Sequence, residues 1–286
     1  MSNGPEPSPS AGLGASPRKT VRLRRITDSG AIDVEDVAAV EEPLEIRLHD
    51  QAFAVIMRTP GADRPLAAGF LLAEGVITSG DELGAVEHCR HPDHPEGHNV
   101  VNVFLLGEAA VALPGRLAER RHVVANSSCG ICGRMTIESL QTRASALPQT
   151  GTIDRAVVHG LPGQLRARQP LFDETGGLHG AAIFTFGGDC VAAAEDVGRH
   201  NAVDKVVGDR LLDGRLPLDG HALVVSGRVS YEIVQKAWLA GIEVICAVSA
   251  PSSLAVELAE QAGITLVGFA RPPGFNLYSH PARLRM

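Results

Sequence analysis

The second half of this sequence predicts an α/β fold in which a mixed sheet is flanked by helices. Short apolar runs alternate there with segments whose apolar residues recur at helical spacing, the pattern of strands joined by crossover helices. The composition is 44% hydrophobic over 286 residues, which is enough for a sizeable core. No uninterrupted apolar run is long enough to span a bilayer, so we expect no membrane association.

The first half is expected to hold a disordered tail followed by a smaller α+β part. Residues 1–20 are rich in Ser, Pro and Gly and lack the apolar stretch of a secretory signal, which predicts the tail. Residues 21–126 mix strand and helix patterns. The elements expected within them are a hairpin of strands 42–49 and 53–59 that turns at Asp50 and Gln51, a helix over 66–76 and a strand over 100–106.

Residues 135–286 carry the regular alternation that defines the α/β part. The expected strands span 181–186, 190–194, 222–225, 244–248 and 265–269, and the expected helices span 202–212, 231–240 and 254–262. Cys190 and Cys246 fall inside these strands, where cysteine behaves as a small apolar residue, so we expect both in the core.

A pair of cysteines, Cys129 and Cys132, lies in a glycine-flanked loop over 127–134. A cysteine reacts as the thiolate, and the dipole of a helix expected to begin at Met135 would favour that form. The spacing leaves three interpretations open: sulfur or redox chemistry, half of a zinc site, and an inert pair. The remaining cysteines are single, so a four-cysteine metal site would have to gather scattered residues.

Glycine or arginine follows three of the predicted strands, at the strand ends where α/β sheets bind ligands. Glycine lets backbone amides approach a ligand, helix N-termini attract anions, and arginine binds phosphate through paired hydrogen bonds. The turns therefore predict a phosphate-bearing ligand, although each alone is also typical of an ordinary loop with a solvated arginine. The candidate binding residues are His200 and Asn201 after one strand, Ser226, Gly227 and Arg228 after another, and Phe269, Ala270, Arg271, Pro272, Pro273 and Gly274 at the last.

The residues after the first of these turns have local interpretations as well. Asn201 suits the N-cap of the following helix, with Asp204 three residues later as in a capping box. Lys205 is then expected on the solvated face of that helix. His200 is a candidate general base, and it equally suits a local hydrogen bond.

Other histidines suggest weaker sites. The segment 88–98 gathers His, Cys, Asp and Glu, which are common metal ligands, but its prolines and irregular spacing favour a solvated loop. His179 precedes a strand, where it could face a pocket or serve a turn. The net charge of −7 and the low aromatic content argue against a nucleic-acid partner.

The motifs 128–133, 195–205, 226–228 and 235–237, in this order, resemble the formate dehydrogenase accessory sulfurtransferase family, FdhD. The resemblance covers nearly all of the chain after the tail. It implies a cytidine-deaminase-like α/β core in a cytoplasmic homodimer. It also implies that the protein takes sulfur from a cysteine desulfurase and passes it to the molybdenum bis(molybdopterin guanine dinucleotide) cofactor that formate dehydrogenase requires.

The resemblance also assigns residues. Cys129 matches the persulfide-forming cysteine of the family, Cys132 its partner, and 269–274 its cofactor-binding segment. The consecutive prolines Pro272 and Pro273 depart from the single proline expected there. The molybdenum cofactor is expected as a bound substrate, with no permanent cofactor, because no HxE motif followed by PCxxC is present to hold zinc. The alternatives are a cofactor-binding chaperone with a structural or zinc-holding CxxC, and a thiol oxidoreductase.

Overall fold

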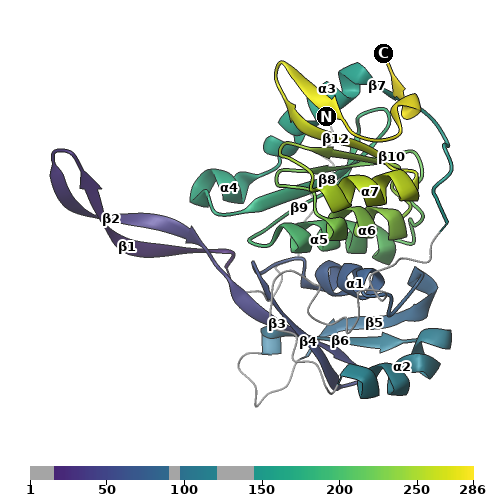
Figure 1. Ribbon diagram of the computed structural model, residues 1–286. Coiled ribbons are helices and arrows are strands. Elements are labelled where there is room, and N and C mark those ends of the chain that lie inside the picture. The colour runs from purple at the N-terminus through teal and green to yellow at the C-terminus, as the bar shows by residue number, and fades with distance from the viewer. Residues whose placement is uncertain (1–15, 90–96, 121–144) are drawn as a thin grey trace, which may run out of the picture.

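The computed structural model describes residues 16–89, 97–120 and 145–286, which form two sheets with helices between them and a projecting hairpin (Figure 1). The N-terminal sheet has the strand order β4-β3-β6-β5. The predicted hairpin and strand are confirmed, but the turn falls at His49 and Asp50, which both have positive φ, one residue earlier than expected. The strands are β3 (Glu42–Leu48), β4 (Gln51–Arg58), β5 (Leu83–His88) and β6 (Val100–Leu105).

Two helices belong to this N-terminal part. The helix predicted over 66–76 is confirmed as α1 (Asp63–Ala73). A second helix, α2 (Gly107–Arg120), was not predicted, because Pro114 interrupts its sequence and proline normally ends a helix.

The hairpin of β1 (Arg18–Thr27) and β2 (Gly30–Ala39) was also not predicted. It extends away from the rest of the molecule (Figure 1). The expected tail overlaps its first strand at residues 18–20, while residues 1–15 lie outside the described part.

The C-terminal sheet is six-stranded and mixed, in the order β13-β12-β11-β10-β8-β9. Its central strands β10, β11 and β12 are parallel. β8 and β13 pair antiparallel with β10 and β12, and β9 pairs antiparallel with β8, so β9 runs in the direction of the central strands. All five predicted strands are present. The strands are β8 (His179–Thr185), β9 (Cys190–Asp196), β10 (His221–Val225), β11 (Val244–Ala247), β12 (Thr265–Arg271) and β13 (Gly274–Leu277).

Helices cover both faces of this sheet, as predicted. The three expected helices pack with one core cluster and α3 packs with the other. The sequence did not predict α3, since Pro162 lies inside it. The helices are α3 (Arg155–Arg166), α4 (Pro170–Thr175), α5 (Arg199–Leu212), α6 (Tyr231–Leu239) and α7 (Ser253–Ala262). A short parallel pair, β7 (Ile153–Asp154) and β14 (Leu284–Arg285), lies apart from the main sheet.

The two parts meet where α1 packs on α5 (Figure 1). Glycines make this crossing close: a Cβ atom on Gly69 would lie 2.1 Å from the carbonyl oxygen of Asp204, and one on Gly208 would lie 1.9 Å from that of Pro65. Buried residues from both sheets accordingly form one continuous apolar cluster. In the described ranges, none of the helices has the length and apolar character needed to cross a membrane.

Candidate functional site

The three predicted turns lie along one edge of the C-terminal sheet. The turn after β10 is fixed to the start of β8, because Ser226 Oγ accepts a hydrogen bond from the Gly180 N–H at 2.9 Å. The Ser226 N–H in turn donates to the Gly180 carbonyl at 3.0 Å. A Cβ atom on Gly227 would lie 3.2 Å from His179 Nδ1 and 3.7 Å from Arg199 Cδ. This edge therefore brings together the starts of β8 and α5 and the end of β10.

The loop after β11 connects this turn to the last one. Val229 donates to the Ala250 carbonyl at 3.2 Å, and the N–H of Phe269 donates to the Ser249 carbonyl at 3.1 Å. Phe269 has a φ of 52° and is 37% exposed, so it is held in a left-handed conformation within β12, where the pairing with β13 is irregular. The candidate residues 226–228 and 269–274 thus belong to one edge, separated by the strand β11.

Positive charge gathers at this edge around His179. Burial lowers the pKa of His179, and the nearby charges of Arg199, His200 and Arg228 lower it further, although Asp196 opposes them. Among the described residues, Arg199 Nε is buried without a hydrogen-bond partner. No carboxylate in the described ranges forms an ion pair with Arg199 or Arg228. The edge therefore carries cationic groups whose charge the described part of the chain leaves uncompensated.

Two helix N-termini face the same edge. Helix α5 begins after Gly198 and α6 after Ser230, and neither N-cap residue accepts a hydrogen bond from its helix through a side chain. Backbone N–H groups and helix dipoles at such termini favour an anion. Cations and backbone donors together make the edge suitable for a phosphate or another oxyanion.

Asn201 and Lys205 have structural roles that the sequence did not predict. Asn201 lies inside α5 rather than at its N-cap, and its amide donates to the Met57 carbonyl at 2.8 Å and to Asp196 at 2.9 Å. The expectation of a solvated Lys205 is wrong, since it is 3% exposed and its ammonium lies 2.7 Å from Asp196. Lys205 also donates to the Thr59 carbonyl. Met57 and Thr59 are more than a hundred residues away from these side chains, so local sequence could not reveal them as partners.

The expected capping role of Asp204 is also wrong. Its side chain is buried and lies 2.6 Å from Lys236 Nζ of α6. Burial raises the pKa of Asp204, and the ammonium of Lys236 opposes that effect. His200 makes a parallel contact one turn earlier, because its Nε2 lies 3.0 Å from Ser230 Oγ and 2.9 Å from Glu232. Both contacts join α5 to α6 behind the cationic edge.

The described ends of the histidine-rich segment belong to an ion-pair cluster. Arg58, which is 1% exposed, makes a bidentate contact with Asp63. His88 lies 4.0 Å from Asp63, and His98 lies 3.7 Å from Glu42. No group of three or more metal-ligating side chains occurs in the part of the chain that the structure describes, and residues 90–96 lie outside it.

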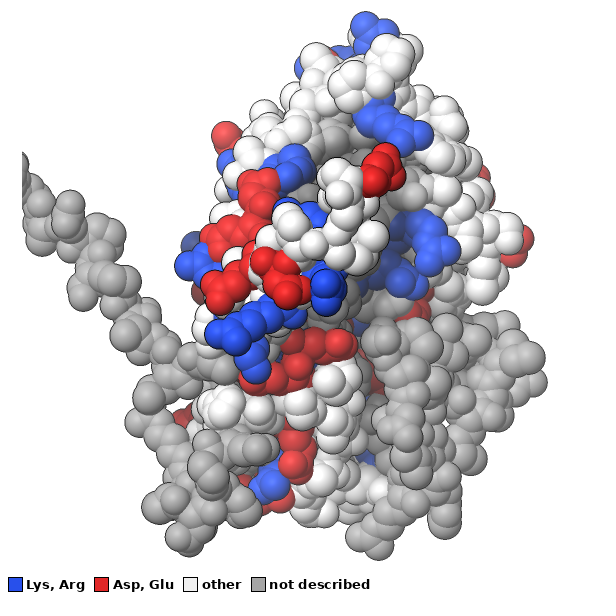
Figure 2. Space-filling model, turned by 90° about the vertical axis from the view of Figure 1, so that its left-hand side faces the viewer, with Lys and Arg blue, Asp and Glu red and all other residues white. Residues whose placement is uncertain are grey.

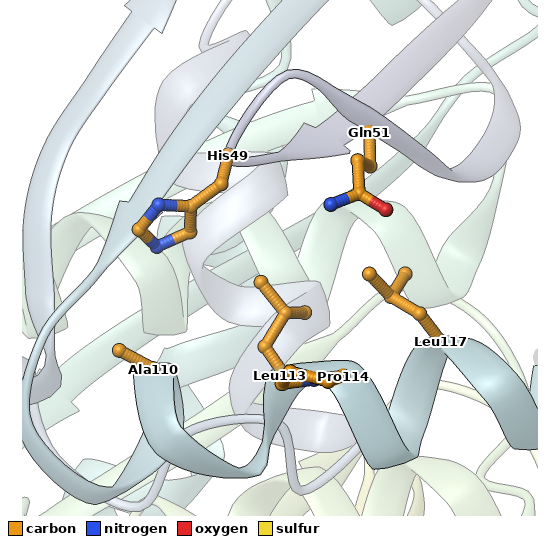
Figure 3. A pocket seen from close by; sticks show the side chains of 6 residues that line it. All are labelled: His49, Gln51, Ala110, Leu113, Pro114 and Leu117. Atoms are coloured by element: carbon orange, nitrogen blue, oxygen red, sulfur yellow. The ribbon is translucent and has the colours of Figure 1, made fainter.

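A separate pocket of about 360 Å³ lies between the β3–β4 turn and α2 (Figure 3). The ring of His49 lies at its rim, and His49 Nε2 accepts a hydrogen bond from the Leu105 N–H at 2.9 Å. The other lining residues offer one amide and several apolar side chains: Gln51, Ala110, Leu113, Pro114 and Leu117. The pocket lacks the cations of the sheet edge and belongs to the N-terminal part.

Cys129 and Cys132 lie outside the described residues. The chain re-enters the described part at Ser145, whose carbonyl accepts a hydrogen bond from Trp238 Nε1 of α6 at 2.9 Å. Two of the described cysteines have unreactive surroundings, because burial raises the pKa of Cys246 to about 12 and also raises that of Cys89. Cys190 is only half-buried, which differs from the core position expected for it.

Two residues of this edge, His179 and Arg199, are not among the predicted binding residues. The sequence indicates only a pocket or turn role for His179, and it places Arg199 within the motif 195–205. The available signal was an arginine directly after a strand-ending glycine, Gly198, at the first position of a helix.

Comparisons with known proteins agree with one another. Residues 39–285 match the FdhD/NarQ family. The chain is 47% identical to the sulfur carrier protein FdhD of Nocardia farcinica, over 94% of this chain and 96% of that protein. It is 43% identical to the protein of the same name from Sulfurisphaera tokodaii, over 93% and 98%. A crystal structure described as a formate dehydrogenase accessory protein from Desulfotalea psychrophila aligns with a TM-score of 0.75 and 26% identity, over 94% of this chain and all of that one.

Proposed function

Because this chain belongs to the FdhD/NarQ family, we propose that it is a sulfur carrier that serves the maturation of a formate dehydrogenase. The observation that carries the proposal is the identity of 43–47% to named sulfur carrier proteins over almost the whole chain. The cationic sheet edge supports it, since that edge offers an anion site of the kind a nucleotide-bearing substrate needs.

Cys129 is the proposed carrier of the sulfur atom. Its thiolate attacks the outer sulfur of a persulfide on a cysteine desulfurase, the donor S–S bond breaks, and the donor cysteine leaves as a thiolate. Cys129 then holds the sulfur as a persulfide. This step makes the protein a sulfurtransferase.

Cys132 has two possible roles in the second step. It can accept the outer sulfur in a relay, which leaves Cys129 as a thiolate. Alternatively, its thiolate attacks the Cys129 sulfur, a disulfide forms between the two residues, and the outer sulfur leaves as hydrosulfide. Only the second route oxidises the cysteine pair.

The substrate that receives the sulfur is proposed to be the molybdenum bis(molybdopterin guanine dinucleotide) cofactor. Its phosphates would bind Arg228, Arg199 and the N-termini of α5 and α6, and residues 269–274 would contact the remainder. Asn201 is not proposed as a contact, because its amide is already committed to Met57 and Asp196.

Three further elements of the proposal come from the family resemblance. They are a cytidine-deaminase-like relationship for the C-terminal core, a homodimeric state, and a place of action in the cytoplasm, where thiols stay reduced. The mixed order of the six-stranded sheet is compatible with the first of these.

The test is sulfur loading followed by mass spectrometry. The full chain is incubated with a cysteine desulfurase and cysteine, and we expect the peptide that contains Cys129 to become heavier by one sulfur atom. Cys129→Ala should abolish loading and fail to restore formate dehydrogenase activity in a deletion strain. Cys190→Ala, which alters a half-buried thiol of the described part, is the matched control and should load normally.

Two outcomes would replace the proposal by an alternative. If Cys129→Ala restores formate dehydrogenase activity, the sulfur-transfer role is wrong and a cofactor chaperone is favoured. Stoichiometric zinc in protein purified without added metal, together with no sulfur loading, would instead assign a structural role to the CxxC pair.

A further inference from the structure

The loop between β4 and α1 reaches across to the turn that precedes α5, and Thr59 makes the contact. Thr59 is 1% exposed. Its N–H donates to Asp196 Oδ2 at 3.1 Å, and its Oγ1 accepts from the Val197 N–H at 3.1 Å. Its carbonyl accepts from Lys205 Nζ at 2.9 Å. Thr59 is therefore committed to this segment and shielded from solvent.

Asp196 extends this contact to the residue at which α5 starts. Its side chain is fully buried, and both carboxylate oxygens are engaged. Oδ1 accepts from the Gly198 N–H at 2.8 Å and from the Asn201 amide at 2.9 Å. Oδ2 accepts from the Thr59 N–H and lies 2.7 Å from the Lys205 ammonium. Gly198 is the N-cap of α5, so one carboxylate joins Thr59 to the first turn of that helix.

A second tie reaches the same turn from the end of β4. Asn201, in the first turn of α5, donates to the Met57 carbonyl at 2.8 Å. The packing is tight, because a Cβ atom on Gly198 would lie 2.9 Å from Asn201 Nδ2. Met57 and Thr59 thus hold the first turn of α5 from the N-terminal part of the molecule.

Donors of the proposed anion site begin at this turn. Arg199 is the first residue of α5, and its Nε is buried without a partner among the described residues. The first turn of α5 contains no acidic residue, and the leading N–H groups of a helix lack partners within it. The Arg199 side chain and these N–H groups therefore move with the turn that Thr59 holds.

Arg199 differs from the arginines of the projecting hairpin. On the side of the molecule toward which the hairpin projects, basic and acidic side chains are interspersed (Figure 2). Arg18, Arg22 and Arg24 of β1 are each paired with a carboxylate there. Arg199 has no such pair in the described ranges, so its charge is available to an anionic ligand.

The other half of the anion site is positioned separately. Arg228 belongs to the turn that Ser226 ties to Gly180 at 2.9 Å, and this tie lies within the C-terminal sheet. The two halves meet where a Cβ atom on Gly227 would lie 3.7 Å from Arg199 Cδ. A ligand that binds both arginines requires the correct spacing of the two turns. That spacing depends on the N-terminal part through Thr59.

We propose that Thr59 is a positioning residue of the anion site, which holds the first turn of α5 at the distance from Arg228 that a nucleotide diphosphate requires. The inference rests on the proposed function, because it takes the cationic edge as the binding site for the guanine nucleotide moieties of the substrate. It gives the N-terminal part a role in substrate binding through a residue that is itself shielded from the substrate.

Isothermal titration calorimetry of the full chain with GDP tests the proposal. Thr59→Val preserves the shape of the side chain but leaves the Val197 N–H without its acceptor, so the turn should shift. We expect the dissociation constant of GDP to rise at least about fivefold, and that of inorganic pyrophosphate to rise by a similar factor, because the affected contacts are to phosphate. Thr59→Ser retains the hydroxyl and should bind GDP within about twofold of wild type.

Thr265→Val is the matched control. Thr265 is fully buried at the start of β12, and its hydroxyl donates to the His280 carbonyl at 2.8 Å and accepts from Arg283 at 3.0 Å. Loss of these bonds should lower the urea midpoint at least as much as Thr59→Val does, whereas the dissociation constant of GDP should stay within about twofold of wild type. Asn201→Ala removes the tie to Met57 and should weaken GDP binding as Thr59→Val does, so the turn is still tested if Thr59→Val does not fold.

Three results would overturn the proposal. They are unchanged GDP affinity in folded Thr59→Val, or in Asn201→Ala where Thr59→Val does not fold; failure of Thr59→Ser to retain affinity; and equal weakening by Thr265→Val. A wild-type protein that binds neither GDP nor pyrophosphate would overturn it as well, since no anion site would exist to be positioned. Sulfur loading of Cys129 is measured on the same samples. Absent loading in wild type together with the expected GDP constants would count against the proposed function and not against the role of Thr59.

Discussion

Gly208→Ala should strongly destabilise the protein, because Gly208 allows α5 to touch α1. The added Cβ atom would lie 1.9 Å from the Pro65 carbonyl oxygen and 2.7 Å from the Gly69 nitrogen. Both are backbone atoms, so no side-chain rotation can relieve the overlap. An ordinary contact is about 3.4 Å or longer, and the helices must separate by roughly 1.5 Å to restore it.

That separation opens the crossing on which both sheets depend. Overpacking costs typically 1–3 kcal/mol, and we expect about 3 kcal/mol here because rigid backbone meets rigid backbone. This is a large part of the roughly 5–15 kcal/mol by which folded proteins are stable. Urea denaturation followed by far-UV circular dichroism and by the fluorescence of Trp238, the single tryptophan, measures the loss.

Gly163→Ala is the matched control. Gly163 lies within α3, and a Cβ atom there would meet nothing within 4 Å. Removing backbone freedom without a clash should stabilise the protein by about 0.5–1 kcal/mol. The reasoning fails if Gly208→Ala unfolds within about 0.5 kcal/mol of wild type, or if Gly163→Ala loses as much stability as Gly208→Ala.

Three other variants probe the sheet edge and its support. GDP should raise the melting temperature of the protein in thermal-shift assays, and Arg228→Ala should reduce that increase. Substitution of the exposed Arg215 by Ala is the control and should leave the increase unchanged. Equal effects of the two variants would show that Arg228 is not part of the site. Burial and nearby cations lower the pKa of His179, so below a pH of about 6.5 this residue binds fewer protons in the folded protein than in the unfolded chain. The free energy of unfolding should therefore fall as the pH decreases through that value. His179→Gln should flatten this fall in urea titrations at pH 5 to 7.5, and an unchanged slope would contradict the assignment. Lys205→Met leaves the carboxylate of Asp196 buried without its cation and should cost about 3–5 kcal/mol, part of which the double variant with Asp196→Asn should recover in the same titrations.

The sequence predicted those elements whose signal is local. Strands such as β11 are buried on both faces, so their sequences are unbroken apolar runs, and the turns that follow such strands lie together at one edge of the sheet, as the sequence predicts. Helices α2 and α3 were missed because each contains a proline whose cost is offset by packing that the sequence does not display. The hairpin was missed because charged side chains interrupt the apolar residues of both strands.

The position of the candidate site could be predicted from the sequence, but the hydrogen bonds and ion pairs among its residues could not. Gly227 and Arg228 lie where the sequence placed them, since a turn after a strand is a local feature. Lys205 was assigned to the solvent because its neighbours on α5 give no sign of Thr59, which reaches it from the N-terminal part. Tertiary partners decide whether a charged helix residue is exposed, and they become visible only with the fold.

The contact between α1 and α5 should allow the protein to assemble from two separate fragments of its chain. Helix α1 precedes residues 121–144 and helix α5 follows them. The hydrogen bonds from Asn201 to Met57 and from Lys205 to Thr59 also join the chain before residue 121 to the chain after residue 144. Two separately translated polypeptides, 1–120 and 145–286, should hence recognise each other and reassemble without a peptide bond between them. Such a split protein would present the cationic edge without the cysteine pair, which allows cofactor affinity to be measured apart from sulfur chemistry.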